Sequence, residues 1–262
     1  MTVKANEKGR RMRKGERKSL VCVGIDQSLI GTAVAVLVDG RLHWVHGWTG
    51  VKSLQKEFPD LLSFYKIGEQ SDAARTERID HFAHWIADCV VSLLRHPGYR
   101  VYVAMEGYAM SQRSNRATDL HELGGLIKNL LWREAIPLRV YNPVDIKIAF
   151  TGDGKATKAA MMMACFQHFG QDYTQLRDSG DNLADAQLIA QLLHFEMTAR
   201  MNRSASLSSL GIPKHVQKML NKTTKKAAVP VLDRPFSSML EQSKNKLIWG
   251  ARPSPMRGVD HE

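Results

Sequence analysis

Two acidic residues stand at the ends of largely apolar segments. Asp26 and Glu106 each follow a run of five mostly apolar residues that is typical of a buried strand. Neither acid has a structural reason to lie there, because a carboxylate is costly to bury unless it has a partner. Asp181 and Asp185 form a third acidic group, at the start of an apolar helical pattern. Carboxylates carried on strand ends and a helix end can converge on a divalent metal ion.

Hydrolysis of a phosphodiester bond is one reaction that such a group of acids supports. Two Mg²⁺ ions about 3.5–4 Å apart can activate the attacking water and stabilise the leaving oxygen. Because Mg²⁺ keeps several waters, three or four carboxylates are enough to hold the ions. If the strands before Asp26 and Glu106 are neighbours, both side chains meet at the edge of the sheet where ligands of open α/β sheets bind.

The helical pattern offers two candidates for a fourth ligand. Asn182 lies three residues before Asp185 and Asp181 lies four before it, so either one shares a helix face with Asp185. Structural explanations remain open for both acids. Asp181 has the residue type of a helix N-cap, and Asp185 fits a first-turn acid that the helix dipole favours.

Hydrophobic periodicity predicts the elements that would position these residues. Apolar, β-rich runs predict strands, and an Asp-Gly pair predicts a hairpin turn between the second and third of them. Apolar residues at helical spacing predict the helices, and residues 49–72 are expected to form a loop or a short helix. The strands are expected at 21–25, 31–38, 42–48, 101–105 and 138–141, and the helices at 74–94, 118–135, 143–150, 157–169 and 182–197. A meander followed by alternating strands and helices indicates a mixed α/β sheet with helices on both faces.

Four segments, in this order along the chain, resemble the RuvC-type Holliday junction resolvases. They are Gly24-Ile25-Asp26-Gln27-Ser28 with Gly31 further on, the strand ending in Met105-Glu106, the segment from Lys147 to Lys158, and Asp181-Asn182-Leu183-Ala184-Asp185-Ala186. The resemblance spans roughly residues 21–195. It implies an RNase H-like fold with a mixed five-stranded sheet, hydrolysis with two Mg²⁺ ions for which Mn²⁺ can substitute, and a homodimer acting on branched DNA. No nucleotide cofactor is expected.

The chain departs from the family pattern at two places that bear on function. Where the family has an acid or a histidine three residues before its last aspartate, this chain has Asn182, which can ligate a metal but carries no charge. The aromatic residue that the family uses to open the junction is matched only by Tyr108, one position early. These departures, with a longer loop at 110–116 and a basic tail, suggest a divergent member of phage or mobile-element type.

Basic residues near the acids are the candidate DNA contacts. Lys147, Lys155 and Lys158 belong to the family-like segment, and Arg113 and Arg116 flank the loop after Glu106. The glycine loop at 152–155 lacks the spacing of a nucleotide-binding P-loop, but a loop that leads into a helix can present N–H groups and lysines to a phosphate. The alternative is that these side chains are solvated loop charges.

The formal charge of +11 is concentrated at both ends of the chain. Residues 1–20 carry +6 and residues 196–262 carry +7, whereas the residues between them carry −2. We therefore expect a basic flexible arm at 1–18, a nuclease domain at 19–200 and a basic, largely disordered tail at 201–262. Basic arms favour binding to a polyanion such as DNA.

Cysteine content and hydropathy indicate the cellular compartment in which the protein is expected. The three cysteines are far apart, which favours a reducing compartment over a disulfide framework or a zinc site. No apolar run is long enough for a membrane span. The expected location is the cytoplasm, that of the host if the protein is phage-encoded.

The sequence therefore predicts a Mg²⁺-dependent, structure-selective endodeoxyribonuclease of crossover-junction type. Two alternatives remain open. One is an RNase H-like nuclease that cuts RNA–DNA hybrids or flaps. The other is an inactive protein that binds branched DNA and lost its activity at Asn182. The helix at 118–135 is the candidate dimer interface, although its apolar face would equally suit a core.

Overall fold

The computed structural model describes residues 18–68, 71–107, 115–223 and 229–237. Within them the chain forms one six-stranded sheet with the strand order β4-β3-β2-β1-β5-β6. β1, β2 and β3 are antiparallel neighbours, whereas β5, β6 and β4 each pair in parallel. The strands are β1 Ser19–Asp26, β2 Ala33–Val38, β3 Arg41–Thr49, β4 Leu62–Phe64, β5 Tyr99–Glu106 and β6 Leu138–Tyr141.

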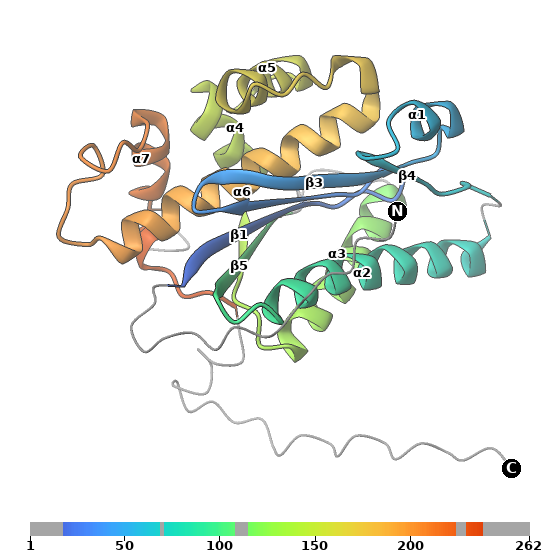
Figure 1. Ribbon diagram of the computed structural model, residues 1–262, viewed down its shortest axis with the longest axis horizontal. Helices are drawn as coiled ribbons and strands as arrows, with labels where there is room; N and C mark the ends of the chain where they lie inside the picture. The colour runs from blue at the N-terminus through green and yellow to red at the C-terminus, as the bar shows by residue number, and fades with distance from the viewer. Residues whose placement is uncertain (1–17, 69–70, 108–114, 224–228, 238–262) are drawn as a thin grey trace, which may run out of the picture.

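Helices cover both faces of this sheet (Figure 1). α2 and α3 lie on one face, and α6 lies on the other with α4, α5 and α7 around it. Alternate residues of β1 serve the two layers: Val23 belongs to the core beneath α2 and α3, and Cys22 to the core beneath α6. The helices are α1 Lys52–Glu57, α2 Asp72–Leu94, α3 Asn115–Arg133, α4 Pro143–Thr151, α5 Lys158–Phe169, α6 Asp178–Met201 and α7 Lys214–Leu220, with the short 3₁₀ helices η1 Thr174–Leu176 and η2 Val231–Asp233.

The strand order and the two helical layers confirm the expected α/β class and RNase H-like fold. The predicted hairpin is also present, because Asp39 and Gly40 both have positive φ, at 49° and 80°, as a tight two-residue turn requires. The prediction of five strands was wrong by one. β4 is only three residues long and pairs with β3 alone, so its sequence has no room for an alternating pattern.

α6 begins four residues earlier than its apolar pattern predicts. Ser179 and Gly180 are poor helix formers, but tertiary packing overrides that preference. A Cβ at position 180 would collide with the backbone oxygen of Tyr173, so the close approach of the chain before α6 requires glycine there. Asp181 therefore lies in the first turn and is not the N-cap, which is Arg177.

Part of the predicted C-terminal tail packs on the domain. Val216 and Leu220 of α7 are completely buried, and Ser237 forms an antiparallel bridge with Leu138 at the edge of β6. The domain boundary expected near residue 200 therefore lies too early. This segment includes the helix α7, Lys214–Leu220.

The apolar stripe of α3 is used inside the chain. Leu123, Ile127 and Leu131 are fully buried in the core that α3 shares with α2 and the sheet. The stripe predicted as a dimer interface is therefore core in this chain.

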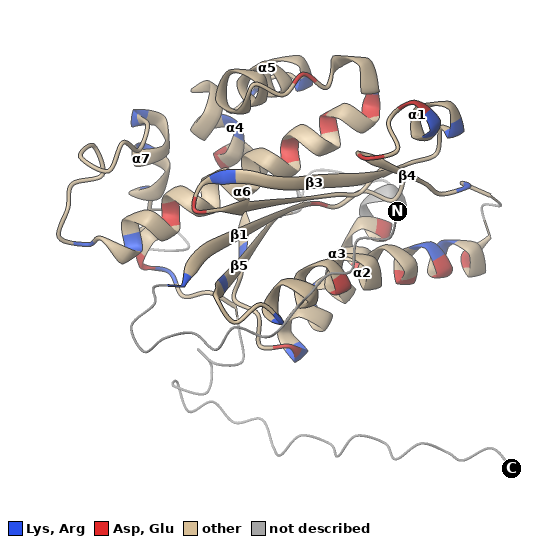
Figure 2. Cartoon of the chain, viewed as in Figure 1, with Lys and Arg blue, Asp and Glu red and all other residues tan. Residues whose placement is uncertain are grey.

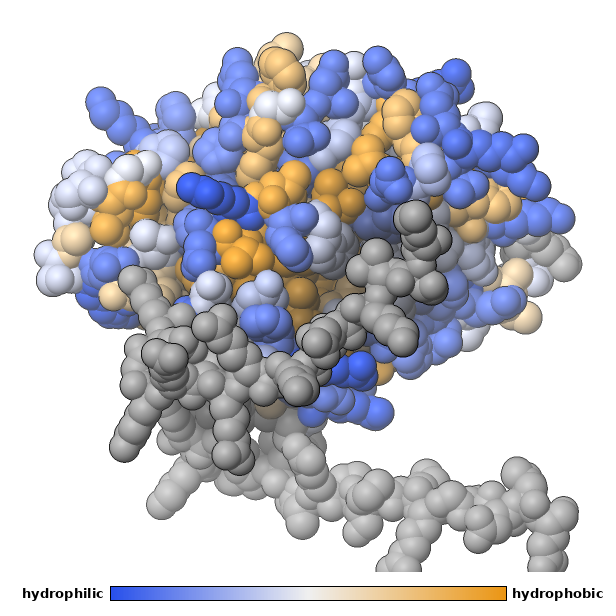
Figure 3. All heavy atoms as spheres, viewed as in Figure 1, coloured by the Kyte–Doolittle hydropathy of each residue, from blue (hydrophilic) through white to orange (hydrophobic). Residues whose placement is uncertain are grey.

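On the other side of the sheet, apolar side chains lie among hydrophilic ones over α5 and α6 (Figure 3). Among the described residues, no helix combines the length and the apolar character that a membrane crossing needs.

Candidate active site

The parallel pairing of β1 and β5 brings Asp26 and Glu106 to the same edge of the sheet. Ile25 pairs with Met105, and the two acids are the next residue of each strand. The side chain of Gln27 spans the strands, since its Nε2 donates to the backbone oxygen of Glu106 at 3.0 Å. The prediction that these carboxylates end neighbouring strands is confirmed.

A glycine in β1 allows α6 to lie directly on the strand. A Cβ on Gly24 would collide with the backbone of Ala186 and Ala190, so only glycine permits this approach. The helix then runs across β1 with Asp181 and Asp185 in its first two turns. Acidic positions follow one another along the start of α6 in Figure 2.

Burial and mutual repulsion raise the pKa values of the three central acids. The Asp26 carboxyl is only 7% exposed, and burial, followed by the charges of Asp185 and Glu106, raises its pKa well above the usual range. Burial and then the Asp185 charge raise the pKa of Glu106 to about 7. Burial and then the Asp181 charge raise the pKa of Asp185 to about 6. Each acid is thus perturbed by another member of the set, as expected for carboxylates that share one site.

Two of the predicted basic residues act on these acids. The Nζ of Lys158 donates to Oδ2 of Asp181 at 2.8 Å, and this bond raises the pKa of the lysine. The charge of Lys158 also lowers the pKa of Asp26, and Lys147 lowers that of Glu106. Lys155 does not contribute to these contacts; it is exposed in the loop before α5.

The two candidates for the fourth ligand have different surroundings. Asp181 is 8% exposed, accepts the hydrogen bond of Lys158 and raises the pKa of both Asp26 and Asp185. Asn182 lies against the turn after β1, where a Cβ on Gly31 would stand 2.5 Å from its Nδ2. Of the two, Asp181 is the residue whose charge acts on Asp26 and Asp185.

Three of the predicted DNA contacts cannot be placed by their side chains. Tyr108 and Arg113 lie outside the described residues. Arg116 falls in the first turn of α3, and its side chain is outside the description. Their proposed roles remain predictions.

Two polar residues that sequence reasoning missed support the backbone around the acids. Thr32 is fully buried, and its Oγ1 donates to the backbone oxygen of Asp26 at 2.8 Å. Gln27 is nearly as buried and ties β1 to Glu106. Gln27 directly follows Asp26 in the sequence and Thr32 comes six residues after it, and polar groups that are buried there require partners.

The donor set has the chemistry that a hard divalent cation requires. Mg²⁺ takes oxygen ligands, and acids whose pKa values are raised by one another hold negative charge that a cation would neutralise. Within the ranges that the structure describes, no three acidic, histidine or cysteine side chains are grouped closely enough to hold an ion. The donor types therefore fit a metal ion, but the described side chains are not close enough together to coordinate one as they stand.

The crowding of these acids predicts an effect on stability. Because the pKa of Glu106 is raised in the folded protein, its contribution falls as pH rises from about 4.5 through 7. In metal-free buffer, Glu106→Gln should therefore stabilise the protein by about 2 kcal/mol at pH 8 and have little effect at pH 5. Urea unfolding with EDTA at both pH values measures this. Glu57→Gln, at an exposed position, is the control, and equal effects at the two pH values would contradict the prediction.

Comparison with known proteins gives structural neighbours only. No protein-family description and no curated protein matches this chain. The solved RuvC structure from Thermus thermophilus is 20% identical, with a TM-score of 0.47, and the match covers 70% of this chain and 96% of that one. RuvC from the same organism in complex with a Holliday junction substrate is 23% identical at the same coverage, with a TM-score of 0.49. A ROK hexokinase from T. thermophilus is 11% identical, with a TM-score of 0.27. Similarity at this level does not establish function.

Proposed function

We propose that the chain is a metal-dependent, structure-selective endonuclease that cuts Holliday junctions or other branched DNA. The observation that carries the proposal is the set of buried and half-buried acids at one sheet edge, Asp26, Glu106, Asp181 and Asp185, with two lysines facing them. A stability role does not account for this set, because the members raise one another's pKa values and burial adds to that cost.

The acids have distinct proposed roles. Asp26, on which the charges of the other three acids act, would help to hold both Mg²⁺ ions; Glu106 would hold the ion that stabilises the leaving group, and Asp185 with Asp181 the ion that activates water. When bound, such ions supply positive charge at the phosphate and lower the pKa of a water molecule, and Mn²⁺ has the same ligand preferences. Two facts support Asp181 over Asn182 as the fourth ligand: its carboxylate is charged, and it already accepts a cation, the ammonium of Lys158.

The lysines would hold the phosphate that is cut. Lys147 and Lys158 already face the acids, so their ammonium groups can contact the non-bridging oxygens of a phosphate held there. Lys155, Arg113, Arg116 and Tyr108 are proposed to contact DNA further out. The basic charge at both ends of the chain supports binding to a polyanion.

Paired cuts in a four-way junction require two active sites, and we therefore propose a homodimer. The stripe Leu123, Ile127 and Leu131 cannot form its interface without leaving the core. Another surface must serve, and sedimentation of the protein with and without a junction measures the stoichiometry.

A panel of labelled substrates tests the proposed function. Four-way junctions, flaps, RNA–DNA hybrids and plain duplexes of one length are incubated with the full chain in Mg²⁺, and in EDTA as the control. We expect the junction to be cut at least about tenfold faster than the duplex, with no product in EDTA. Preferred cutting of hybrids or flaps would support an RNase H-like nuclease instead. Junction binding without product in Mg²⁺ or Mn²⁺ would make the chain a non-enzymatic binder.

A further inference from the structure

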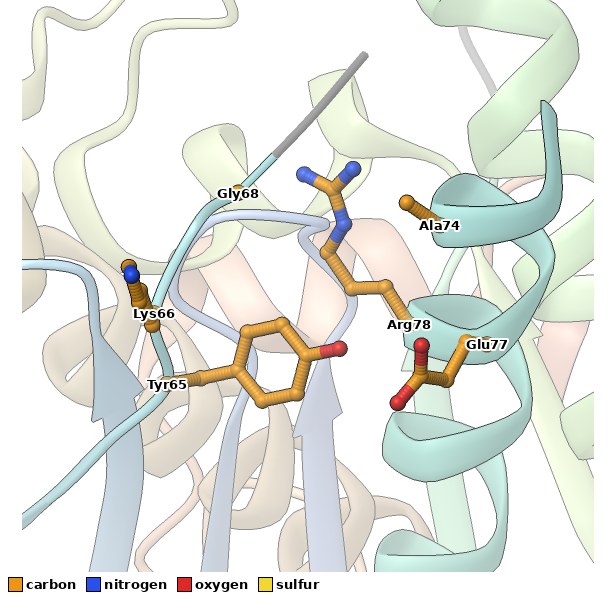
Figure 4. A pocket seen from close by; sticks show the side chains of 6 residues that line it. All are labelled: Tyr65, Lys66, Gly68, Ala74, Glu77 and Arg78. Carbon is orange, nitrogen blue, oxygen red and sulfur yellow. The ribbon is translucent and has the colours of Figure 1, made fainter. Parts of the chain in front are cut away.

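Away from the acids, a polar pocket lies beside the start of α2. Tyr65, Lys66 and Gly68, from the segment that follows β4, form one wall, and Ala74, Glu77 and Arg78 of α2 form the other. Its volume is about 290 Å³, which is enough for a phosphate group with its neighbouring sugar atoms. Figure 4 shows the Tyr65 ring reaching across toward α2 and the Arg78 guanidinium standing between α2 and Gly68.

Arg78 is the unusual residue in this pocket. Its side chain is buried, with 7% exposure, yet no hydrogen bond, ion pair or ring contact joins it to another described residue. Buried arginines are normally paired, because an unpaired buried charge is costly. Arg75, one turn earlier on α2, shows the ordinary arrangement, since its guanidinium binds Asp119 at 2.9 Å.

The lining of the pocket fits an anion with several oxygens. A guanidinium donates two parallel hydrogen bonds to a phosphate, and the Tyr65 hydroxyl, which points toward α2, is a further donor. Glu77 is the acid in the lining; it is exposed and forms no ion pair with Arg78. The pocket therefore presents donors around a guanidinium that lacks a counter-charge among the described residues.

The pocket lies at the same sheet edge as the acids. β1, β3, β4 and β5 run in one direction, so the segment after β4 emerges where Asp26 and Glu106 end their strands. The acids face α6, whereas Tyr65 packs with the core on the α2 side. A DNA strand that crosses this edge can thus reach both places.

We propose that the pocket at Arg78 binds a backbone phosphate of the DNA, at a distance from the phosphate that is cut. The proposal rests on the proposed function only in taking DNA as the source of the phosphate. It assigns Arg78 a positioning role, because the residue contacts the substrate away from the reacting atoms.

The experiment compares Arg78→Met with Arg95→Met, an exposed arginine at the other end of α2. Binding of the full-length protein to a labelled four-way junction is measured in Ca²⁺ across a range of salt concentrations, so that cleavage is not needed. Loss of one phosphate contact should lower the slope of log affinity against log salt by about 1, and affinity by several-fold. Arg95→Met should leave the slope unchanged. Methionine matches the unbranched stem of arginine and removes the charge, so Arg78→Met should melt at or above the wild-type temperature.

Three results would overturn the proposal. The first is an unchanged slope for Arg78→Met with wild-type stability. The second is an unchanged slope with a lower melting temperature, which would make Arg78 a structural residue. The third is stabilisation of wild type, but not of Arg78→Met, by inorganic phosphate alone with no change in the DNA slope, which would assign the pocket to a free anion. If wild type itself does not bind the junction, the proposed function fails instead, and the two failures are distinguishable.

Discussion

Asp26→Asn should abolish Mg²⁺-dependent cleavage of a four-way junction while leaving junction binding intact. Asp26 is the most buried of the acids, and burial, followed by the charges of Asp185, Glu106 and Asp181, raises its pKa. The amide keeps the volume of the carboxylate but removes the charge that would hold two ions at once. We expect the cleavage rate to fall by about a thousandfold or more, which corresponds to about 4 kcal/mol of transition-state stabilisation.

Single-turnover cleavage and junction binding in Ca²⁺ measure the two parts of this prediction separately. Asp60→Asn is the matched control, because Asp60 is an exposed aspartate just before the outermost strand β4, which β3 and β2 separate from β1. Cleavage by Asp26→Asn within threefold of wild type would remove Asp26 from the chemistry. Loss of binding along with cleavage would mean that the substitution disturbs the fold.

Glu196→Ala should destabilise the protein by about 3–5 kcal/mol, although Glu196 lies far along α6 from the acids. Its carboxylate has no solvent exposure and accepts hydrogen bonds from Arg139 at 2.6 and 3.1 Å and from Arg200 at 2.8 Å. The hydroxyl of Tyr141 donates to it at 2.7 Å. Without Glu196, the buried guanidinium of Arg139 and the partly buried one of Arg200 lose the carboxylate that neutralises both.

The same network holds the C-terminal segment on the sheet. Arg139 and Arg200 both donate to the backbone oxygen of Arg234, and both guanidinium groups lie over the Phe236 ring. Thermal unfolding should show a melting temperature lower by about 10 °C for Glu196→Ala. Glu134→Ala, at an exposed position, should shift it by no more than about 1–2 °C. A loss below about 1 kcal/mol for Glu196→Ala would mean that water or a rearranged partner replaces the carboxylate.

Local patterns in the sequence were sufficient to predict the elements that carry the site. The runs before Asp26 and Glu106 are apolar because those strands are buried on both faces, so each acid marks the end of its strand. Asp39-Gly40 determined its turn because two consecutive positive φ values are costly for most other residue pairs. Patterns of this kind act over a few neighbours, and the amino-acid order records them directly.

Contacts between distant segments decided the features that the patterns missed. β4 exists because β3 offers it a partner, and α6 starts early because Gly180 fits against Tyr173. The partners of Glu196 come from β6 and α6, and the network extends to η2 and the residues after it. The residues next to them in the sequence form no pattern that predicts these pairings.

The sequence by itself thus determined which acids end the strands and that a third acidic group opens a helix. Only the tertiary structure decided that they meet, because parallel pairing of β1 with β5 and the close approach of α6 at Gly24 are long-range events. It also distinguished Asp181 from Asn182. The charge of Asp181 raises the pKa of Asp185, whereas Asn182 lies against Gly31. The absence of a partner for Arg78 among the described residues was equally invisible in the sequence, since it depends on everything that surrounds the side chain in space.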